Sequence, residues 1–234
     1  MTKSSIANLS RAISVLENNL PRKSRILKKL KSLKNKKAFV IGITGSPGSG
    51  KSTLIAHLAK VIRGSRKKVA IVAVDPSSPK TGGAFLGDRV RMQNLTEDPG
   101  VFIRSMASRG AHGGVAKSTK DVAFFLASFG FDFVLIETVG SGQLDYEVTK
   151  FVNLTILVLT PEAGDDMQLM KAGLRELADL FVINKSDRPG ADKMEEFLKQ
   201  TSPKDMPIFK TIAEQGKGVQ ELFEYIASSL RGRQ

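Results

Sequence analysis

Short apolar runs alternate with amphipathic segments over most of the chain, from residue 38 onward. The apolar runs predict strands at 38–43, 69–74, 101–104, 133–136, 154–159, 181–183 and 208–212. Segments whose apolar residues recur every three or four positions predict helices at 51–62, 122–129, 165–178, 191–200 and 219–230. Strands this apolar are typical of a sheet buried on both faces. The pattern therefore predicts an α/β fold, with a mainly parallel sheet and helices on both faces.

Residues 1–37 follow a different pattern, with apolar residues at helical spacing and many charges between them. A first stripe predicts one helix, for which Ser4 or Ser5 can serve as N-cap: Ile6, Leu9, Ile13, Leu16 and Leu20. Pro21 ends that helix and suits the first turn of the next. A second stripe predicts the second helix: Ile26, Leu27, Leu30 and Leu33. We expect an N-terminal helical extension, residues 1–37, in front of a domain spanning residues 38–234.

The net charge of +13 belongs almost entirely to this extension. Residues 1–37 hold eleven of the 36 Lys and Arg and one of the 23 Asp and Glu, so the other 197 residues carry only +3. We interpret the extension as two amphipathic helices packed on the core with solvated basic faces. Docking onto a protein partner is the main alternative. Nucleic-acid binding is disfavoured, because no aromatic residue interleaves with these charges to stack on bases.

Composition narrows the chemistry further. The chain has no Cys, which excludes a disulfide framework, a thiolate nucleophile and a Cys-ligated metal. No apolar run approaches the roughly 20 residues that a membrane span needs, and the N-terminus lacks the apolar region of a signal peptide. We therefore expect a cytoplasmic protein without a transmembrane segment.

A glycine-rich run follows the first predicted strand of the domain and precedes its first helix. Gly45, Gly50, Lys51 and Ser52 fit the P-loop pattern G-x-x-x-x-G-K-[ST]. The glycines let successive backbone N–H groups point at a phosphate, beside the positive end of the helix dipole. Lys51 would reach the β- and γ-phosphates, and the Ser52 hydroxyl would ligate Mg²⁺. The predicted phosphate-binding residues are Gly45, Ser46, Pro47, Gly48, Ser49, Gly50, Lys51, Ser52 and Thr53.

A second motif indicates which base the P-loop accompanies. The late strand 181–183 runs into Asn184-Lys185-Ser186-Asp187, an N-K-x-D sequence. The Asp187 carboxylate can accept hydrogen bonds from the N1–H and the exocyclic amine of guanine, an arrangement that adenine does not offer. Asn184 would brace the pocket, and the alkyl stem of Lys185 would lie across the base. The sequence therefore predicts a site for GTP and GDP.

Three acids at strand ends or in loops can supply further oxygen ligands for Mg²⁺: Asp75, Asp88 and Glu137. Glu137 opens Glu137-Thr138-Val139-Gly140, which is similar to the D-x-x-G of GTPases with Glu in place of Asp. The Gly140 N–H can bond the γ-phosphate, so loss of that phosphate would release the loop. The predicted catalytic residues are Lys51, Asp75, Glu137 and Gly140, and the predicted metal ligands are Ser52, Asp75, Asp88 and Glu137.

Longer stretches resemble one family of GTPases, the MeaB/ArgK type. They are Asp75 to Ser78, Gly82 to Met92, Ser108 to Gly110 with Gly113 and Gly114, Glu137 to Gln143, Gly164 to Gln168, and Glu176 to Asp179 leading into Asn184 to Asp187. Members of that family are P-loop G-protein chaperones of adenosylcobalamin-dependent mutases, typified by methylmalonyl-CoA mutase. They gate cofactor delivery and protect or reactivate the mutase. The resemblance implies such a mutase as the partner here.

The resemblance also implies roles for individual residues. It puts Asp75, Asp88 and Glu137 at the Mg²⁺ and γ-phosphate site, and makes the segment from Gly140 to Gln143 switch II. It makes the segment from Pro161 to Lys171, with Asp165 and Lys171, a further switch that communicates with the partner. Ile212, Ala213 and Glu214 stand where family members carry a Ser-Ala pair whose backbone N–H contacts the guanine O6.

Two departures from the family pattern concern partner contacts. Ser141 and Leu144 replace the usual Val and Ser, which alters switch II on its partner side. The sequence ends at Gln234, where longer relatives continue into a helical arm that makes their dimer. Dimerisation stays possible, but the arm through which those relatives dimerise, and with it their usual mode of mutase engagement, is not expected here.

The predicted reaction is in-line attack of water on the γ-phosphate of GTP. No Gln directly follows the segment from Glu137 to Gly140, so we expect slow intrinsic hydrolysis that a partner accelerates. Three alternatives remain open. A nickel-insertion GTPase would need metal ligands, for which the chain offers His57 and His112, both better explained as structural. A nucleotide-switched module could act in another metallo-enzyme maturation system, or on RNA or a membrane surface. Phosphate transfer to an amino acid is disfavoured, because no acceptor site is evident.

Overall fold

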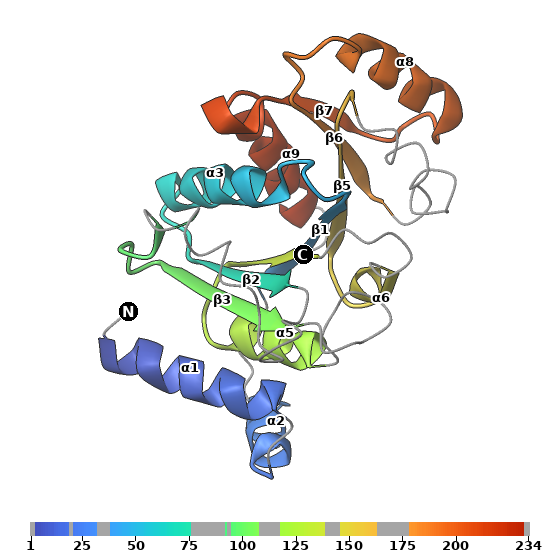
Figure 1. Cartoon of the computed structure of the whole chain (residues 1–234). Coiled ribbons are helices and arrows are strands. Elements are labelled where there is room, and N and C mark those ends of the chain that lie inside the picture. Colours follow the sequence, from blue (N-terminus) through green and yellow to red (C-terminus); the bar gives the residue numbers. More distant parts are fainter. Residues whose placement is uncertain are drawn as a thin grey trace, which may run out of the picture.

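The computed structural model describes residues 3–18, 21–31, 38–75, 92, 95–107, 118–138, 146–162 and 178–231 (Figure 1). A seven-stranded sheet runs through this part of the chain, in the order β3-β2-β4-β1-β5-β6-β7. The strands are β1 (Phe39–Gly45), β2 (Val69–Asp75), β3 (Val101–Ala107), β4 (Phe133–Glu137), β5 (Leu154–Leu159), β6 (Leu180–Asn184) and β7 (Ile208–Thr211). Each neighbouring pair in the sheet is parallel, which confirms the predicted fold class.

Helices cover both faces of the sheet (Figure 1). They are α1 (Lys3–Glu17), α2 (Lys23–Lys31), α3 (Lys51–Gly64), α5 (Thr119–Ser128), α6 (Tyr146–Thr149), α8 (Ala191–Thr201) and α9 (Val219–Arg231), with a short 3₁₀ helix, η3 (Ala213–Gln215). None of the helices in the described residues is long and apolar enough to cross a membrane.

Alternation along the strands divides the core into layers. In β1, Ile41 and Ile43 pack with residues of α3 and α9 on one face, whereas Val40 packs with α1 and α5 on the other. This is the alternation expected of a strand, because successive side chains point to opposite faces. A third cluster lies around β6 and α8. The sheet is therefore buried on both faces, as its apolar strands predict.

The first helix of the extension belongs to this core. Leu9, Ile13 and Leu16 are fully buried in the cluster that contains β2, β4 and α5. At its end, Glu17 accepts a hydrogen bond from Arg104 Nη2 of β3, at 2.6 Å. Leu9, Ile13 and Leu16 of the predicted apolar stripe thus form the packed face of α1, which covers one face of the sheet.

Several boundaries differ from the sequence-based prediction. Helix α1 begins at Lys3, so Ser4 and Ser5 lie inside it and the predicted N-cap is wrong. A capping side chain contributes only about 1 kcal/mol, which a longer packed helix can outweigh. Strand β3 continues past the predicted 101–104 to Ala107, because its polar residues still pair with β2. Helix α6 has only one turn, so its sequence cannot show the repeated apolar spacing from which a helix is predicted, and it was not predicted. The predicted helix 165–178 lies outside the described residues, except Ala178, which is not helical.

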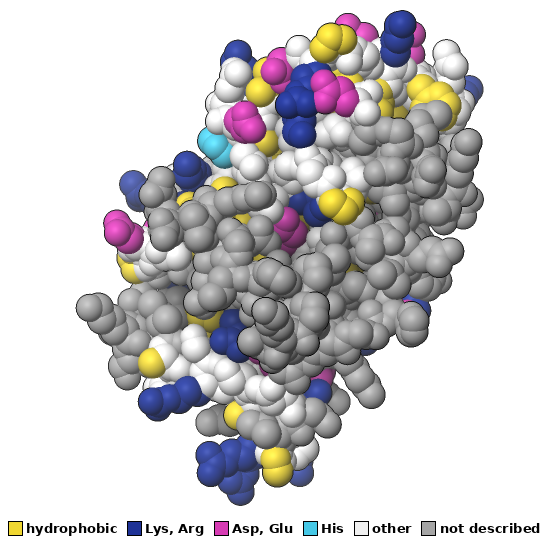
Figure 2. Space-filling model, in the orientation of Figure 1, with side chains coloured by type: hydrophobic (Ala, Val, Ile, Leu, Met, Phe, Trp, Pro, Cys, Tyr) yellow, Lys and Arg dark blue, Asp and Glu magenta, His cyan; other side chains and the backbone are white. Residues whose placement is uncertain are grey.

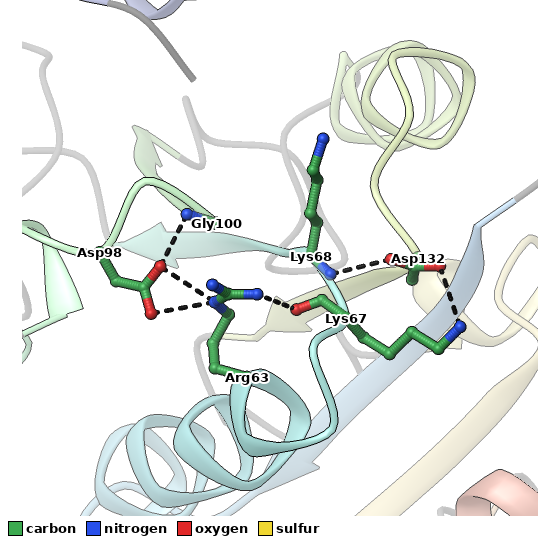
Figure 3. Close-up of polar contacts among 6 residues, drawn as sticks. All are labelled: Arg63, Lys67, Lys68, Asp98, Gly100 and Asp132. Atoms are coloured by element: carbon green, nitrogen blue, oxygen red, sulfur yellow. Dashed lines mark hydrogen bonds and ion pairs between the residues drawn. The ribbon is translucent and has the colours of Figure 1, made fainter.

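A set of ion pairs holds the end of α3 against the amino edge of the sheet (Figure 3). Arg63 Nε donates to both oxygens of Asp98, at 3.0 and 2.9 Å, and Asp98 Oδ1 also accepts from the Gly100 N–H at 2.7 Å. Just before the neighbouring strands β4 and β2, Asp132 Oδ2 accepts a hydrogen bond from the Lys68 N–H at 2.9 Å. The hydrogen bond from Arg63 lowers the pKa of Asp98. These contacts fix the strand starts at the edge opposite the P-loop.

Replacing Ile13 by Ala tests whether the first helix stabilises the whole domain. We expect a loss of about 2–4 kcal/mol in the free energy of unfolding, because Ile13 is fully buried and its truncation leaves a cavity. Urea unfolding gives the value. The exposed neighbour Arg11, changed to Ala, is the control and should cost less than about 0.5 kcal/mol. Equal small effects for both variants would contradict the packing.

Replacing Asp98 by Asn tests the ion pair through its pH dependence. The pKa of Asp98 is lower in the folded state than the ordinary value of 3.8, so its stabilising contribution is present above pH 3.8 and is lost as the pH falls through the folded-state pKa. We therefore expect the stability difference between wild type and Asp98→Asn to shrink at acid pH. Urea unfolding at a series of pH values measures it. A stability difference that stays the same at every pH would contradict the ion pair.

Candidate nucleotide site

The predicted site residues gather at the carboxyl edge of the sheet. Gly45 ends β1 and Asn184 ends β6, while Glu137 ends β4. Strands β1 and β5 are neighbours in the sheet, but after β1 the chain continues to β2 on one side of this pair, whereas after β5 it continues to β6 on the other side. Ligands of open α/β sheets bind outside the carboxyl ends of the strands at such a point. Topology alone thus places the P-loop where a ligand is expected.

The P-loop lies so close to the neighbouring strands that two of its glycines cannot carry a side chain. Gly45 has φ +144°, and a Cβ there would lie 2.2 Å from the carbonyl oxygen of Val158 in β5. Gly50 has φ +90°, and its Cβ would lie 2.3 Å from Nδ2 of Asn184. Both positions therefore require glycine for backbone conformation and for space. The loop is held against β5 and β6.

The buried side chains of the loop are polar. The Nζ of Lys51, a residue only 6% exposed, donates to the carbonyl oxygens of Gly45 and Ser46, both at 2.9 Å. The hydroxyls of Ser46 and Ser49 are buried and have no hydrogen-bond partner within the described part of the chain. No side chain caps α3, so the positive end of its dipole faces the loop. This is the arrangement of an anion site at a helix N-terminus.

One short hydrogen bond joins the P-loop helix to the end of β4. The Ser52 hydroxyl donates to Oε1 of Glu137 at 2.6 Å, and both residues are buried. The next residue, Thr138, donates its N–H to the carbonyl oxygen of Ile43 in β1, at 3.1 Å. The start of the segment from Glu137 to Gly140 is therefore fixed beside Ser52.

Other residues predicted for the metal and the switches are described in part or not at all. Asp75 ends β2, and β2 pairs with β4 through Ala73 opposite Glu137, so the Asp75 backbone lies at the same edge of the sheet. The side chain of Asp75 is outside the described structure. So are the following predicted residues: Asp88, Gly140, Gln143, Asp165 and Lys171.

Asn184 connects three parts of the site through its side-chain amide. Its Nδ2 donates to the carbonyl oxygen of Ser49 in the P-loop, at 2.8 Å. Its Oδ1 accepts from the Thr211 hydroxyl at 3.1 Å and from the Ala213 N–H at 3.0 Å. The residue is 2% exposed. The bracing role predicted for Asn184 thus has a definite geometry, in which one amide spans the phosphate loop and the loop after β7.

Lys185 makes a second connection to the P-loop. It takes a left-handed backbone conformation, with φ +55°, and its Nζ donates to the carbonyl oxygen of Gly48 at 2.9 Å. The Ser186 N–H donates to the Thr211 carbonyl oxygen at 3.0 Å. The N-K-x-D turn is therefore held from both sides.

A pocket opens between these loops and brings most of the predicted base-binding residues together. It is lined by Gly50, Thr53, Asn184, Lys185, Asp187, Arg188, Ile212, Ala213, Glu214 and Gln215. In the loop after β7, the Ile212 N–H donates to the Lys217 carbonyl oxygen, and the Ala213 N–H donates to Asn184. Both N–H groups are therefore engaged within the protein.

The sequence analysis missed Arg188, Thr211 and Gln215. Arg188 directly follows Asp187, and its side chain is ion-paired with Glu162, which lies just after β5. This contact joins the base pocket to the start of the segment from Pro161 to Lys171. The position of Arg188 beside Asp187 is a signal that sequence reasoning could have used. The positions of Thr211 and Gln215 depend on how the loop after β7 folds back, which no motif encodes.

His57 lies beside Gly216, a residue of the turn that follows η3. It lies on α3, and a Cβ added to Gly216 would come within 2.9 Å of its Nδ1. Burial, and to a lesser extent the charge of Lys60, lowers the pKa of His57. Among the described residues, no three of His, Cys, Asp and Glu form a group that could hold a metal ion. His112 lies outside them.

Comparisons with known proteins agree with this geometry. The protein-family model described as methylmalonyl Co-A mutase-associated GTPase MeaB matches residues 9–231. A putative GTPase of Pyrococcus horikoshii is 45% identical over 230 residues, which cover 93% of this chain and 72% of that protein. The mitochondrial methylmalonic aciduria type A homolog of Mus musculus is 36% identical over 200 residues, covering 80% of this chain and 48% of that protein.

A solved structure gives the same fold. The crystal structure of an LAO/AO transport system kinase superposes with a TM-score of 0.72 and covers 99% of this chain and 76% of that one. The two sequences are 24% identical, so the likeness supports the fold alone.

Replacing Asn184 by Ala tests the brace. The change leaves the Ser49 carbonyl and the Ala213 N–H without their partner, so we expect a loss of about 2–4 kcal/mol in the free energy of unfolding. We also expect GDP affinity to fall about tenfold or more, because the two loops lose their link. Urea unfolding and calorimetry measure these effects. Thr211→Val removes a single hydrogen bond and should have a clearly smaller effect on both; equal effects would contradict the brace.

Proposed function

The chain belongs to the family of methylmalonyl Co-A mutase-associated GTPases, and we propose that it gates cofactor loading or protection of an adenosylcobalamin-dependent mutase such as methylmalonyl-CoA mutase. The resemblance to MeaB/ArgK-type GTPases is confirmed by this match and by the named relatives. The chain is accordingly a GTPase, with GTP as substrate and GDP as product. We propose residues 38–234 as the GTPase domain and residues 1–37 as its N-terminal helical extension.

The observation that carries the proposal is the hydrogen bond between Ser52 and Glu137. It joins the helix that follows the phosphate loop to the first residue of the segment from Glu137 to Gly140. Loss of the γ-phosphate would therefore act on the start of this segment through Glu137. A chaperone that is switched by its nucleotide requires such a connection. The ion pair of Arg188 with Glu162 gives the base pocket a similar connection to the segment that contains Asp165 and Lys171.

Ser52 and Glu137 also suit Mg²⁺. The Ser52 Oγ and the Glu137 Oε1 are hard oxygen donors only 2.6 Å apart, next to the P-loop, and Mg²⁺ takes such donors in an octahedral shell. When bound, Mg²⁺ would neutralise charge on the β- and γ-phosphates. We propose Ser52 and Glu137 as its protein ligands, with Asp75 and Asp88 as further candidates from the sequence.

Different residues of the site bind the base and the phosphates of GTP. The Asp187 carboxylate accepts hydrogen bonds from the guanine N1–H and exocyclic amine, while the stem of Lys185 lies across the base. The loop from Ile212 to Glu214 borders the same pocket. At the other end, the P-loop N–H groups and the Lys51 ammonium hold the phosphates. Base and phosphates are thus bound by two loops that share the Asn184 side chain.

Hydrolysis proceeds by in-line attack of water on the γ-phosphorus. The bond from the γ-phosphorus to the bridging oxygen breaks, GDP retains that oxygen, and the γ-phosphoryl group leaves as inorganic phosphate. The Lys51 ammonium and the P-loop N–H groups stabilise the charge that develops on the phosphate oxygens. The Gly140 N–H is proposed as a further donor to the γ-phosphate. A partner that orders the switch segments would complete this environment and raise the rate.

Replacing Asp187 by Asn tests the base recognition. The Asn side chain can donate to the C2 oxygen of xanthine, but it cannot accept both hydrogen bonds that guanine donates. We expect GTP affinity to fall about 10²-fold or more and affinity for xanthosine triphosphate to rise. Fluorescence titration with both nucleotides measures the change. A parallel loss for both nucleotides would contradict the assignment.

Measuring GTP turnover with the adenosylcobalamin-dependent mutase of the same organism tests the switch function. We expect turnover to rise about tenfold or more at saturating mutase, because the partner completes the charge-stabilising site. The variant Lys51→Ala is the control, and it should lose turnover in both conditions. Equal wild-type rates with and without saturating mutase would contradict the proposal.

A further inference from the structure

A basic and aromatic surface lies on the helices that cover the other face of the sheet from α3 and α9. We define the α2–α5 surface by six exposed side chains: Arg22, Arg25, Lys28, Lys120, Phe124 and Phe129. Phe124 and Phe129 are 39% and 44% exposed, and they are the large hydrophobic side chains that stand out to solvent in the described part of the protein. Most of the described Phe side chains are buried, so two exposed rings on a helix that packs beside a basic one make this a candidate binding surface.

An ion pair brings the two helices of this surface together. Lys23 Nζ of α2 lies 2.8 Å from Asp121 Oδ2 of α5. Phe124 follows Asp121 by three residues and Lys120 by four, so the three side chains share one side of α5. The exposed ring of Phe124 therefore lies on the side of α5 that meets α2.

Both acidic residues of these helices already form ion pairs within the protein. Residues 3–17, 22–31 and 119–128 hold nine Lys and Arg against two acids, Glu17 and Asp121. Glu17 is paired with Arg104 of β3, and Asp121 with Lys23. Within the described structure, Arg22, Arg25, Lys28 and Lys120 form no ion pair. Figure 2 shows Lys and Arg side chains gathered at this end of the molecule, where α1 and α2 lie. The surface therefore carries a strong positive potential that a partner can neutralise.

The apolar pattern favours a folded protein as the occupant. A helix that binds a membrane turns its apolar face outward. Here the apolar residues Leu9, Ile13 and Leu16 are buried in the core, and Ile26 packs against it. A single-stranded nucleic acid would need open ring faces for stacking. The ring of Phe129, however, already packs against Phe125 and Phe131, with centroids 5.8 and 6.4 Å apart.

A protein interface combines the features that this surface has. Arg and aromatic residues are enriched in interfaces and often dominate their energy, while surrounding charges steer the encounter. We propose that the α2–α5 surface docks an acidic, partly apolar face of the mutase that this GTPase serves. The identity of the occupant rests on the proposed function. Because α2 and α5 lie on the opposite face of the sheet from α3 and α9, docking there leaves the guanine pocket open (Figure 1).

The test compares two charge-reversal variants that carry the same change in net charge. Arg25→Glu with Lys28→Glu alters the α2–α5 surface, whereas Lys193→Glu with Lys204→Glu alters exposed bases on α8 and in the turn that follows it. A third variant, Phe124→Ser, removes one ring without changing charge. The probe is the purified adenosylcobalamin-dependent mutase of the same organism, and interferometry measures its Kd at low and high salt. Thermal unfolding and GTP turnover without mutase check that each variant is folded and active.

We expect the Kd to rise about tenfold or more for the α2 double variant and for Phe124→Ser, while the α8 double variant stays within about twofold of wild type. Salt should weaken wild-type binding more than it weakens binding of the α2 double variant. Turnover without mutase should be unchanged in all three variants, because none alters a residue of the nucleotide site.

The outcomes separate the two proposals. If wild type binds the mutase and all variants bind equally well, the docking surface is wrong and the proposed function stands. If wild type does not bind the mutase, both proposals are overturned. If the α2 double variant keeps the mutase but loses binding to phosphatidylglycerol vesicles or to single-stranded RNA, the surface serves a membrane or nucleic acid instead, which contradicts the docking proposal.

Discussion

The site depends on one buried amide, the side chain of Asn184. It donates to the P-loop through the Ser49 carbonyl and accepts from the Thr211 hydroxyl and the Ala213 N–H. Three segments that are far apart in sequence are thereby fixed relative to one another. A buried amide without these partners would be costly, so the contacts hold or fail together. With the phosphates proposed at one loop and the base at the other, this single side chain would set the distance between the two ends of the nucleotide.

The arrangement of strands in the sheet allows the Asn184 side chain to contact both loops. The P-loop follows β1 and packs against β5 at Gly45. Asn184, the last residue of β6, lies next to Gly50. At the amino edge, the ion pair of Arg63 with Asp98 holds α3 in place (Figure 3). On the far face, α1 covers the sheet with fully buried apolar residues. The carboxyl edge can therefore carry loops with buried polar groups, because the rest of the domain is tightly packed.

Much of this could be predicted from the sequence. Apolar runs gave the seven strands to within a few residues, since strands buried on both faces have an unambiguous signal. The P-loop and N-K-x-D motifs led to residues that the structure brings together around one pocket. Ser52 and Glu137 were predicted at one metal site, but the direct hydrogen bond between them was not. The ion pair of Arg188 with Glu162 could not be predicted, because it joins residues distant in sequence that belong to no motif. The start of α1 was missed, because capping preferences are weak beside packing.

In this interpretation, the P-loop and the loops around Asn184 bind one guanine nucleotide as a single unit. Hydrogen–deuterium exchange of the protein with Mg²⁺ and GDP, compared with Mg²⁺ and ADP, tests this most directly. We expect GDP to slow exchange in residues 45–53, 184–187 and 211–215 together, over the same range of concentration, and ADP not to protect the last two segments. Protection of residues 45–53 alone, or equal protection by both nucleotides, would contradict it.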